Sequence, residues 1–169
     1  MLCLYNGHTF ILSSVEKQQI WSTVEKLLID NQVEVRKHAA AVLAGLMKGG
    51  DEDLARDFRD RAYLKANNLQ RKRKQRNLSS GHSIASMHGA VLALTASVLS
   101  APYDMPRCVL VTLLARFAGE PTPVKSTVTK AVAEFRRTHA DTWNVQKNSF
   151  TEEQLEVLAD TSSSSSYFA

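Results

Sequence analysis

The sequence predicts an all-α fold, an α-solenoid fragment built from antiparallel helix hairpins with a flexible C-terminal tail. The apolar residues of every regular segment recur at the helical period, and no run of alternating β-branched residues competes with them. The segments come in pairs joined by short links, as in αα-hairpins. No segment can bury its apolar face alone, which is typical of stacked helical repeats. A globular helix bundle is the alternative, because the pairs align poorly with one another.

The first hairpin begins with a capping box. The Ser13 hydroxyl and the Glu16 carboxylate each satisfy a free backbone amide at the start of a helix. A break at Asp30 separates this helix from a second one, which ends at the glycine pair that begins with Gly49. Residues 30–46 combine an acidic turn with an alanine- and leucine-rich ridge, and they resemble the second helix of a HEAT repeat. We therefore expect a HEAT-like solenoid.

The remaining helices are predicted from their caps and stripes. A third helix starts at Asp51, where acidic residues favour the positive end of the helix dipole. A second hairpin follows a basic segment, and Gly119 closes it. Pro123 is expected at the first position of the next helix. Thr151 and Gln154 form a second capping box at the start of the last helix.

One segment is apolar enough to raise the question of a membrane span. No Lys, Arg, Asp or Glu occurs between Arg76 and Asp104. A transmembrane helix needs about 20 predominantly apolar residues, but Ser86, His88 and Thr95 interrupt this stretch. We expect a helix buried among other helices, with a small-residue side that allows close approach, and no membrane partner. A membrane span is the alternative.

The sequence shows no pattern typical of catalysis or metal binding. It has no GxSxG motif, no cysteine placed with a histidine and no glycine loop for phosphate. His82 and His88 are six residues apart, so they lie on different helix faces and not in the i, i+4 pairing of a metal site. Cys3 and Cys108 form no disulfide framework, which favours a reducing compartment. We expect a non-enzymatic protein with no catalytic residue, no metal and no cofactor.

A basic run is the strongest charge feature. Only neutral residues lie between its cations, and Tyr63 is the one aromatic residue close by. Such a run is typical of a nuclear-import signal, a contact for an anionic ligand, a nucleic-acid patch or a solvated surface. The scarcity of aromatic rings argues against nucleic-acid stacking. The residues predicted for nuclear import or anionic-ligand contact are Arg71, Lys72, Arg73, Lys74 and Arg76.

The last residues read SSSSSYFA, an unusual ending for a helical chain. A serine run cannot bury apolar surface, so Ser162–Ser166 predict a flexible tether. Tyr167 and Phe168 can bury large rings in a partner, and the carboxylate of Ala169 can pair with a lysine there. A frayed terminus is the first alternative. A peptide read by a β-augmenting domain is the second.

Two stretches carry a family resemblance. RFAGEPTPVKSTVTKAVAEFRRTHADTW (116–143), and FTEEQLEVLAD (150–160) with the final YFA, resemble the C-terminal region of the 200-kilodalton proteasome activator family (proteasome activator complex subunit 4-like). The resemblance implies a HEAT-like solenoid that caps the 20S core particle, inserts its tail between α-ring subunits, helps to open the gate and promotes ATP- and ubiquitin-independent degradation. This chain would be the C-terminal part of such an activator.

The family's tail motif is a hydrophobic residue, a tyrosine and a terminal residue. Carried over to this sequence, Tyr167 takes the hydrophobic position, Phe168 the tyrosine position and Ala169 the terminus. Phe168 departs from the motif, because it keeps the ring and lacks the phenolic hydroxyl. The missing hydrogen bond would cost about 1 kcal/mol of binding free energy. The resemblance therefore implies docking more firmly than gate opening.

The resemblance also implies a location in the nucleus and cytoplasm, DNA repair and recognition of acetylated histones and other chromatin components. Acetyl-lysine pockets need an asparagine beside aromatic walls, and Asn67 and Asn68 have only Tyr63 nearby. No acetyl-lysine site is therefore assigned. The alternative function is a nuclear HEAT-like adaptor that uses the basic run to bind nucleic acid or acetylated histones.

Four regions follow from these patterns. We expect HEAT-like helices over residues 1–64, a basic linker over 65–82, a C-terminal helical domain of the activator type over 83–160, and a flexible serine-rich tail that carries the docking motif over 161–169.

Overall fold

The computed structural model describes residues 12–49, 51–75, 84–100 and 107–163. These residues form helices and short connections, and none of them lies in a strand, so the predicted all-α class is confirmed. The elements in chain order are α2 (Ser14–Leu27), α3 (Val33–Gly49), α4 (Glu52–Gln75), α5 (Ile84–Leu99), α6 (Cys108–Ala115), α7 (Val124–Thr138), α8 (Trp143–Gln146), the 3₁₀ turn η1 (Lys147–Ser149) and α9 (Glu152–Ser163).

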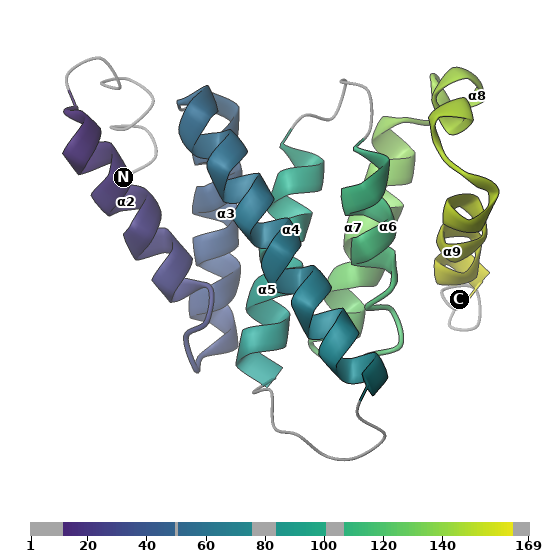
Figure 1. Ribbon diagram of the computed structural model, residues 1–169, viewed down its shortest axis with the longest axis horizontal. Coiled ribbons are helices and arrows are strands. Elements are labelled where there is room, and N and C mark those ends of the chain that lie inside the picture. The colour runs from purple at the N-terminus through teal and green to yellow at the C-terminus, as the bar shows by residue number, and fades with distance from the viewer. Residues whose placement is uncertain (1–11, 50, 76–83, 101–106, 164–169) are drawn as a thin grey trace.

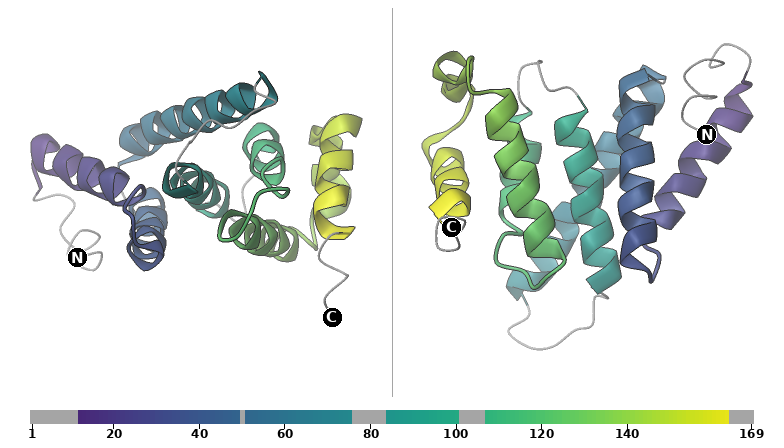
Figure 2. Two further views of the ribbon diagram at one scale, coloured as in Figure 1. Left: turned by 90° about the horizontal axis from the view of Figure 1, so that it is seen from below. Right: turned by 180° about the vertical axis from the view of Figure 1, so that it is seen from behind.

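The helices lie side by side in a row, with α4 running diagonally across one face of it (Figure 1). Helix α2 occupies one end of the row and α9 the other, and the two further views show the same order (Figure 2). This arrangement is that of a solenoid-like fragment, because each helix packs mainly against its neighbours along the row.

Helix α5 lies at the centre and joins two apolar cores. It packs against α3, α4, α6 and α7. One side gives Leu92 and Ala96 to an N-terminal core, and the other gives Val91 and Leu94 to a C-terminal core. The prediction that this segment is a helix buried among other helices is confirmed. Among the described residues, no helix combines the length and apolar character that crossing a bilayer requires.

Large aromatic side chains fill the two cores. In the N-terminal core, Trp21 of α2 meets Phe58 of α4 with ring centroids 5.8 Å apart. In the C-terminal core, Phe135 of α7 packs edge-on against Trp143 and Phe150, at 6.3 and 6.5 Å. The Trp21–Phe58 pair connects two helices that are distant in sequence, and the other three rings hold α7 against the segment that follows it. Aromatic pairs of this kind stabilise a core beyond the area they bury.

Both predicted capping boxes are confirmed. The Ser13 backbone amide donates to Glu16 Oε2 at 2.8 Å, and the Glu16 amide donates to Ser13 Oγ at 3.3 Å. The Thr151 amide donates to Gln154 Oε1 at 3.0 Å, and the Gln154 amide donates to Thr151 Oγ1 at 3.3 Å. One detail differs from the prediction. Pro123 was expected at the first helical position, but α7 begins at Val124 and Pro123 is its N-cap residue.

The linker predicted from residue 65 begins inside a helix. Helix α4 continues to Gln75, because its inner face stays packed there: Ala66 is fully buried, and the Gln70 side-chain amide donates to the Arg116 carbonyl at 2.9 Å. The tail predicted from residue 161 also begins later, since α9 runs to Ser163. Residues 76–83 and 164–169 lie outside the described residues, and the other predicted boundaries stay predictions.

Candidate docking surfaces

Helix α9 determines where the end of the chain leaves the fold. It packs against α6 and α7, and its Leu158 is only 2% exposed. An Arg136 guanidinium nitrogen on α7 donates to the Leu158 carbonyl at 2.6 Å, and Arg116 pairs with Glu153 at 3.0 Å. These contacts fix α9 at the end of the row opposite α2 (Figure 1). The residues that follow therefore start from an anchored helix end.

The predicted docking residues Tyr167, Phe168 and Ala169 lie outside the described residues. Three serines separate them from Ser163, the last residue of α9. Three extended residues reach about 10 Å, half the reach expected from a tether that begins at residue 161. The docking role of these residues stays a prediction. The position of α9 sets the point from which the tail starts.

The first two residues of the basic run, Arg71 and Lys72, lie on an exposed face of α4. The exposed residues from position 61 onward recur at spacings of three and four, so they share one face of the helix. Arg61 pairs with Glu25 at 3.3 Å, and Leu64 is 57% exposed between the cations. Across residues 12–49, 51–75, 84–100 and 107–163, no acidic side chain forms an ion pair with the other cations of this face. The face, here called the α4 basic face, consists of Arg61, Leu64, Lys65, Asn68, Arg71 and Lys72.

Only two of the five predicted basic-run residues have described side chains. Arg71 and Lys72 are both exposed on the α4 basic face. The backbones of Arg73 and Lys74 belong to α4, but their side chains lie outside the described part, as does the whole of Arg76. The structure adds Arg61 and Lys65 to the same face. It shows the surface to be helical and not extended.

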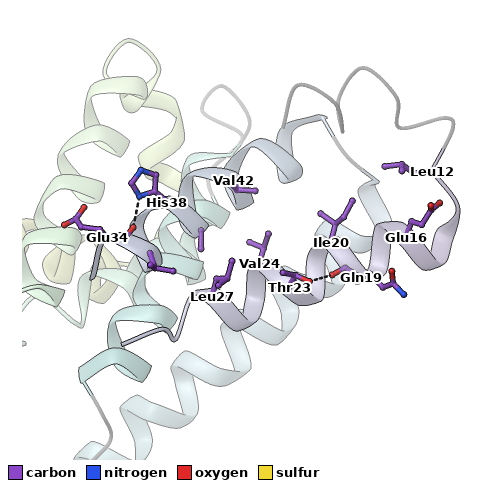
Figure 3. A pocket seen from close by; sticks show the side chains of 12 residues that line it. Leu12, Glu16, Gln19, Ile20, Thr23, Val24, Leu27, Glu34, His38 and Val42 are labelled. Carbon is purple, nitrogen blue, oxygen red and sulfur yellow. Dashed lines mark hydrogen bonds between the residues drawn. The ribbon is translucent and has the colours of Figure 1, made fainter. Parts of the chain in front are cut away.

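An apolar groove of about 650 Å³ lies between α2 and α3 (Figure 3). Polar side chains line its edges, where the Thr23 hydroxyl donates to the Gln19 carbonyl at 2.8 Å and His38 Nδ1 lies 2.8 Å from the Glu34 carbonyl. Sequence reasoning did not locate this groove. The apolar residues that line it are Leu12, Ile20, Val24, Leu27, Val35, Ala39 and Val42.

A buried chain of hydrogen bonds connects α3, α5 and α7. Arg36 Nε donates to His88 Nδ1 at 3.0 Å. Because Nδ1 accepts, the ring proton of neutral His88 is on Nε2, which donates to Thr127 Oγ1 at 3.0 Å. The Thr127 hydroxyl donates in turn to the Pro123 carbonyl at 3.1 Å. The same Arg36 donates through Nη1 to the carbonyls of the turn between α2 and α3.

This buried chain has a structural role. Burial, helped by the positive charge of Arg36, lowers the pKa of His88 to about 4. The ring is therefore neutral at neutral pH and serves as a fixed acceptor and donor. From the sequence, His88 was considered as a metal ligand and as a polar interruption of the apolar stretch, and its contact with Arg36 was not predicted. Among the described residues, no group of three His, Cys, Asp or Glu side chains could hold a metal ion.

Comparison with known proteins tests the predicted family. The family model for the C-terminal region of proteasome activator complex subunit 4-like proteins matches residues 84–169, a little over half of the chain. The chain belongs to the proteasome activator complex subunit 4-like family. The predicted resemblance is therefore confirmed. The match begins at the first residue of α5 and covers the C-terminal core, α9 and the tail.

Three relatives extend the similarity to the N-terminal half. Proteasome activator subunit 4 of Arabidopsis thaliana is 76% identical over 164 residues, which are 96% of this chain and 9% of that protein. Proteasome activator complex subunit 4 of Homo sapiens is 36% identical over 179 residues, 99% of this chain and 10% of that protein. Proteasome activator BLM10 of Saccharomyces cerevisiae is 29% identical over 155 residues, which are 87% of this chain and 7% of that protein. The chain thus spans a tenth or less of the length of these activators.

Proposed function

We propose that the chain is the C-terminal part of a proteasome activator and binds the 20S core particle through Tyr167, Phe168 and Ala169. The observation that carries the proposal is the family match, which includes these three residues. The anchored helix α9 supports it, because a rigid start for the tether limits the volume that the tail must search. A restricted tail binds with a smaller loss of conformational entropy than a free one.

The chemistry of the tail suits a groove between two protein subunits. Two rings give a large apolar contact at a low cost in rotamer entropy. The terminal carboxylate gives one charge-assisted hydrogen bond to a lysine of the partner. The α-ring of the core particle is the partner that the family implies, and the seat for the tail lies between its subunits. The chain then acts by occupying a site, without catalytic residues or a cofactor.

A three-residue deletion tests this proposal. Binding of the 169-residue chain to immobilised core particle is compared with binding of the chain that lacks residues 167–169. We expect the deletion to weaken binding about tenfold or more, since even 1.4 kcal/mol corresponds to that factor. Ser165→Gly is the matched control, because it alters the tether and keeps both rings and the carboxylate. Equal affinity of the deleted chain would contradict the proposal.

Gate opening is a second step, and Phe168 is the residue that tests it. The family motif has a tyrosine at this position, so Phe168→Tyr restores a hydroxyl to the tail. If a partner group in the α-ring accepts a hydrogen bond from it, the gain is about 1 kcal/mol, or roughly fivefold in affinity. Hydrolysis of a fluorogenic peptide by the core particle should rise with the same substitution. If Phe168→Tyr binds and activates the core particle no better than the natural chain, the hydroxyl has no part in gate opening.

We propose a second role for the α4 basic face, contact with an anionic partner such as nucleic acid. The supporting observation is that Arg61, Lys65, Arg71 and Lys72 share one exposed helix face. The surface is less suited to histones, because their tails are themselves rich in cations and would be repelled unless acetylation removed the charge. A location in the nucleus and cytoplasm, and any part in DNA repair, would follow from this role and from the family.

Salt dependence distinguishes this role from a merely solvated surface. The triple variant Lys65→Gln, Arg71→Gln and Lys72→Gln keeps good helix formers while it removes three charges. Its matched control carries Lys125→Gln, Lys130→Gln and Lys147→Gln, which remove three exposed charges elsewhere. For binding to duplex DNA, the slope of log affinity against log salt should fall by about 0.9 for each lost phosphate contact in the first variant only. Equal slopes in both variants would show a solvated surface.

A further inference from the structure

A cavity of about 450 Å³ lies between the end of α7, the start of α8 and the last turns of α9. Its volume is within the range of about 300–1,000 Å³ that is typical of pockets with a bound ligand. The cavity, here called the α9 pocket, lies at the end of the row opposite α2 (Figure 1). The residues that line it are Arg136, Ala140, Trp143, Leu155, Leu158 and Ala159.

The α9 pocket carries one positive charge. Among the described residues, Arg136 is the only ionisable side chain that lines it, and Glu156 and Asp160 of α9 do not. Arg136 Nη2 donates to the Leu158 carbonyl at 2.6 Å, and the guanidinium has further N–H groups that can donate. No acidic side chain in the described part of the chain forms an ion pair with it. The pocket can therefore accept a carboxylate.

Trp143 gives the pocket a fixed aromatic wall. Its ring packs against Phe150 with centroids 5.6 Å apart and against Phe135 at 6.3 Å, so contacts within the C-terminal core hold it in place. Leu155 of α9 adds a half-buried aliphatic wall. Tryptophan and arginine in shielded pockets dominate the binding energy of many protein–protein interfaces. A carboxylate also pairs more strongly with a cation where apolar walls exclude water.

The pocket lies close to the start of the tail. Ala159 precedes Ser163, the last residue of α9, by four residues, and Leu155 precedes it by eight. These separations are about 6 and 12 Å at the helical rise. Three extended residues then reach about 10 Å to Tyr167. When Tyr167 lies in a groove of the α-ring, the surface of the ring comes within reach of the last turns of α9.

We infer that the α9 pocket binds an acidic side chain of a 20S α-subunit, with its carboxylate on Arg136 and its methylene groups against Trp143. The inference rests on the proposed docking of Tyr167, Phe168 and Ala169, and it adds a second contact beside the tail. Two linked contacts bind more tightly than either alone, because the first one raises the effective concentration of the second. The pocket also fixes the orientation of the chain, which a single tethered contact leaves free.

A charge substitution tests the inference. Binding of the 169-residue chain to immobilised core particle is compared for the natural chain, Arg136→Gln and Arg137→Gln. Arg137 is the matched control, because it is the adjacent residue of α7, is exposed and pairs with Glu134 at 2.6 Å. We expect Arg136→Gln to weaken binding about tenfold, the usual scale for a hydrogen bond to a charged group, and Arg137→Gln to leave it unchanged.

A filled pocket gives a second variant that keeps the contact between Arg136 and α9. Ala159→Leu places a larger side chain in the pocket, removes no side-chain hydrogen bond and keeps a good helix former. Ala41→Leu, at an exposed position of α3, is its control. We expect only Ala159→Leu to weaken binding.

The tail deletion separates this inference from the docking proposal. If the chain without residues 167–169 binds more weakly while Arg136→Gln and Ala159→Leu match their controls, the docking stands and the inference is wrong. If the deleted chain binds as well as the natural one, the docking proposal has failed, and this inference fails with it.

A cross-link identifies the bound group directly. In Arg136→Lys, a carbodiimide joins the lysine amine to a carboxylate that touches it, and the two groups lose one water to form an amide. Mass spectrometry should find position 136 joined to an aspartate or glutamate of an α-subunit, with no such pair for Arg137→Lys. A link to the carboxylate of Ala169 would mean that the chain's own end fills the pocket. That result, or complexes with no link from position 136 to the ring, would overturn the inference.

Discussion

At the residue scale, Gly89 allows α5 to cross the end of α2 at a distance that no side chain would permit. A Cβ atom at this position would lie 2.3 Å from the backbone oxygen of Leu28 and 3.1 Å from a methyl group of Ile29. The obstacle is backbone, so it cannot move aside as the end of a flexible side chain would. The adjacent His88 accepts a hydrogen bond from Arg36, which also donates to carbonyls of the turn between α2 and α3. Two neighbouring residues of α5, His88 and Gly89, therefore position the α2–α3 hairpin.

Gly89→Ala should therefore destabilise the fold. Forcing a methyl group against fixed backbone costs about 1–3 kcal/mol, and we expect the upper end here. Denaturant unfolding followed by circular dichroism measures the loss. Gly119→Ala is the control, because a Cβ atom there would meet nothing within 4 Å, so its stability should be unchanged or slightly raised. Equal losses in the two variants would contradict the close-approach account.

The low pKa of His88 predicts a dependence of stability on pH. The unfolded chain takes up a proton near the ordinary histidine pKa of about 6.5, whereas the folded protein does so only near pH 4. The unfolded state therefore binds more protons between these values, and stability falls as the pH decreases through that window. From pH 7.5 to pH 5 this histidine should remove about 2 kcal/mol from the free energy of unfolding.

Denaturant unfolding at both pH values, for the natural chain and for His88→Gln, measures this contribution. The variant should be less stable at pH 7.5 and should lose about 2 kcal/mol less on acidification. The carboxyl groups of Glu16, Glu34 and Glu134 have lowered pKa values because of their hydrogen-bond partners, so they titrate below this range in both proteins. Parallel pH profiles for the two proteins would show that His88 takes up its proton equally in both states.

At the element scale, the local patterns of the sequence predicted the helices and their caps. Each capping box involves two residues that are three positions apart, so it can be predicted from the sequence without knowledge of the fold. Helix α8 was missed, because it has only four residues and is held by the packing of Trp143 on the ring of Phe135 in the preceding helix, which no local pattern shows. Residues 65–75, nearly half of α4, were predicted as a linker, because their buried edge consists of alanine and glutamine and gives a weak apolar stripe.

Helix α9 should depend on one buried leucine for its position. Leu158→Ala removes a side chain that is 2% exposed in the C-terminal core, and such substitutions cost about 2–5 kcal/mol. Because α9 is a terminal element, we expect the loss to appear first as faster amide hydrogen exchange in α9, with α3 unchanged. Val145→Ala, at a side chain that is 69% exposed, is the control and should alter neither. Equal acceleration in α3 and α9 would mean that the two cores open together.

At the scale of the whole molecule, the sequence predicted the class, the solenoid-like row and the family. It could not show that α5 joins two cores or that Arg36 meets His88, because contacts 52 residues apart leave no local pattern. The α2–α3 groove depends equally on the spacing of two packed helices. The groove and the start of the tail lie at opposite ends of the row, so changes at one end should leave binding at the other unaffected (Figure 1).

The most direct test of the central claim uses the tail alone as a competitor. A synthetic nine-residue peptide, TSSSSSYFA, is added to complexes of the 169-residue chain with 20S core particle, once with a free terminal carboxylate and once as the amide. We predict that the free acid displaces the chain and that the amide does so about tenfold less well, because the amide cannot pair with a lysine. Displacement by neither peptide, with the chain still bound, would contradict docking through the last three residues.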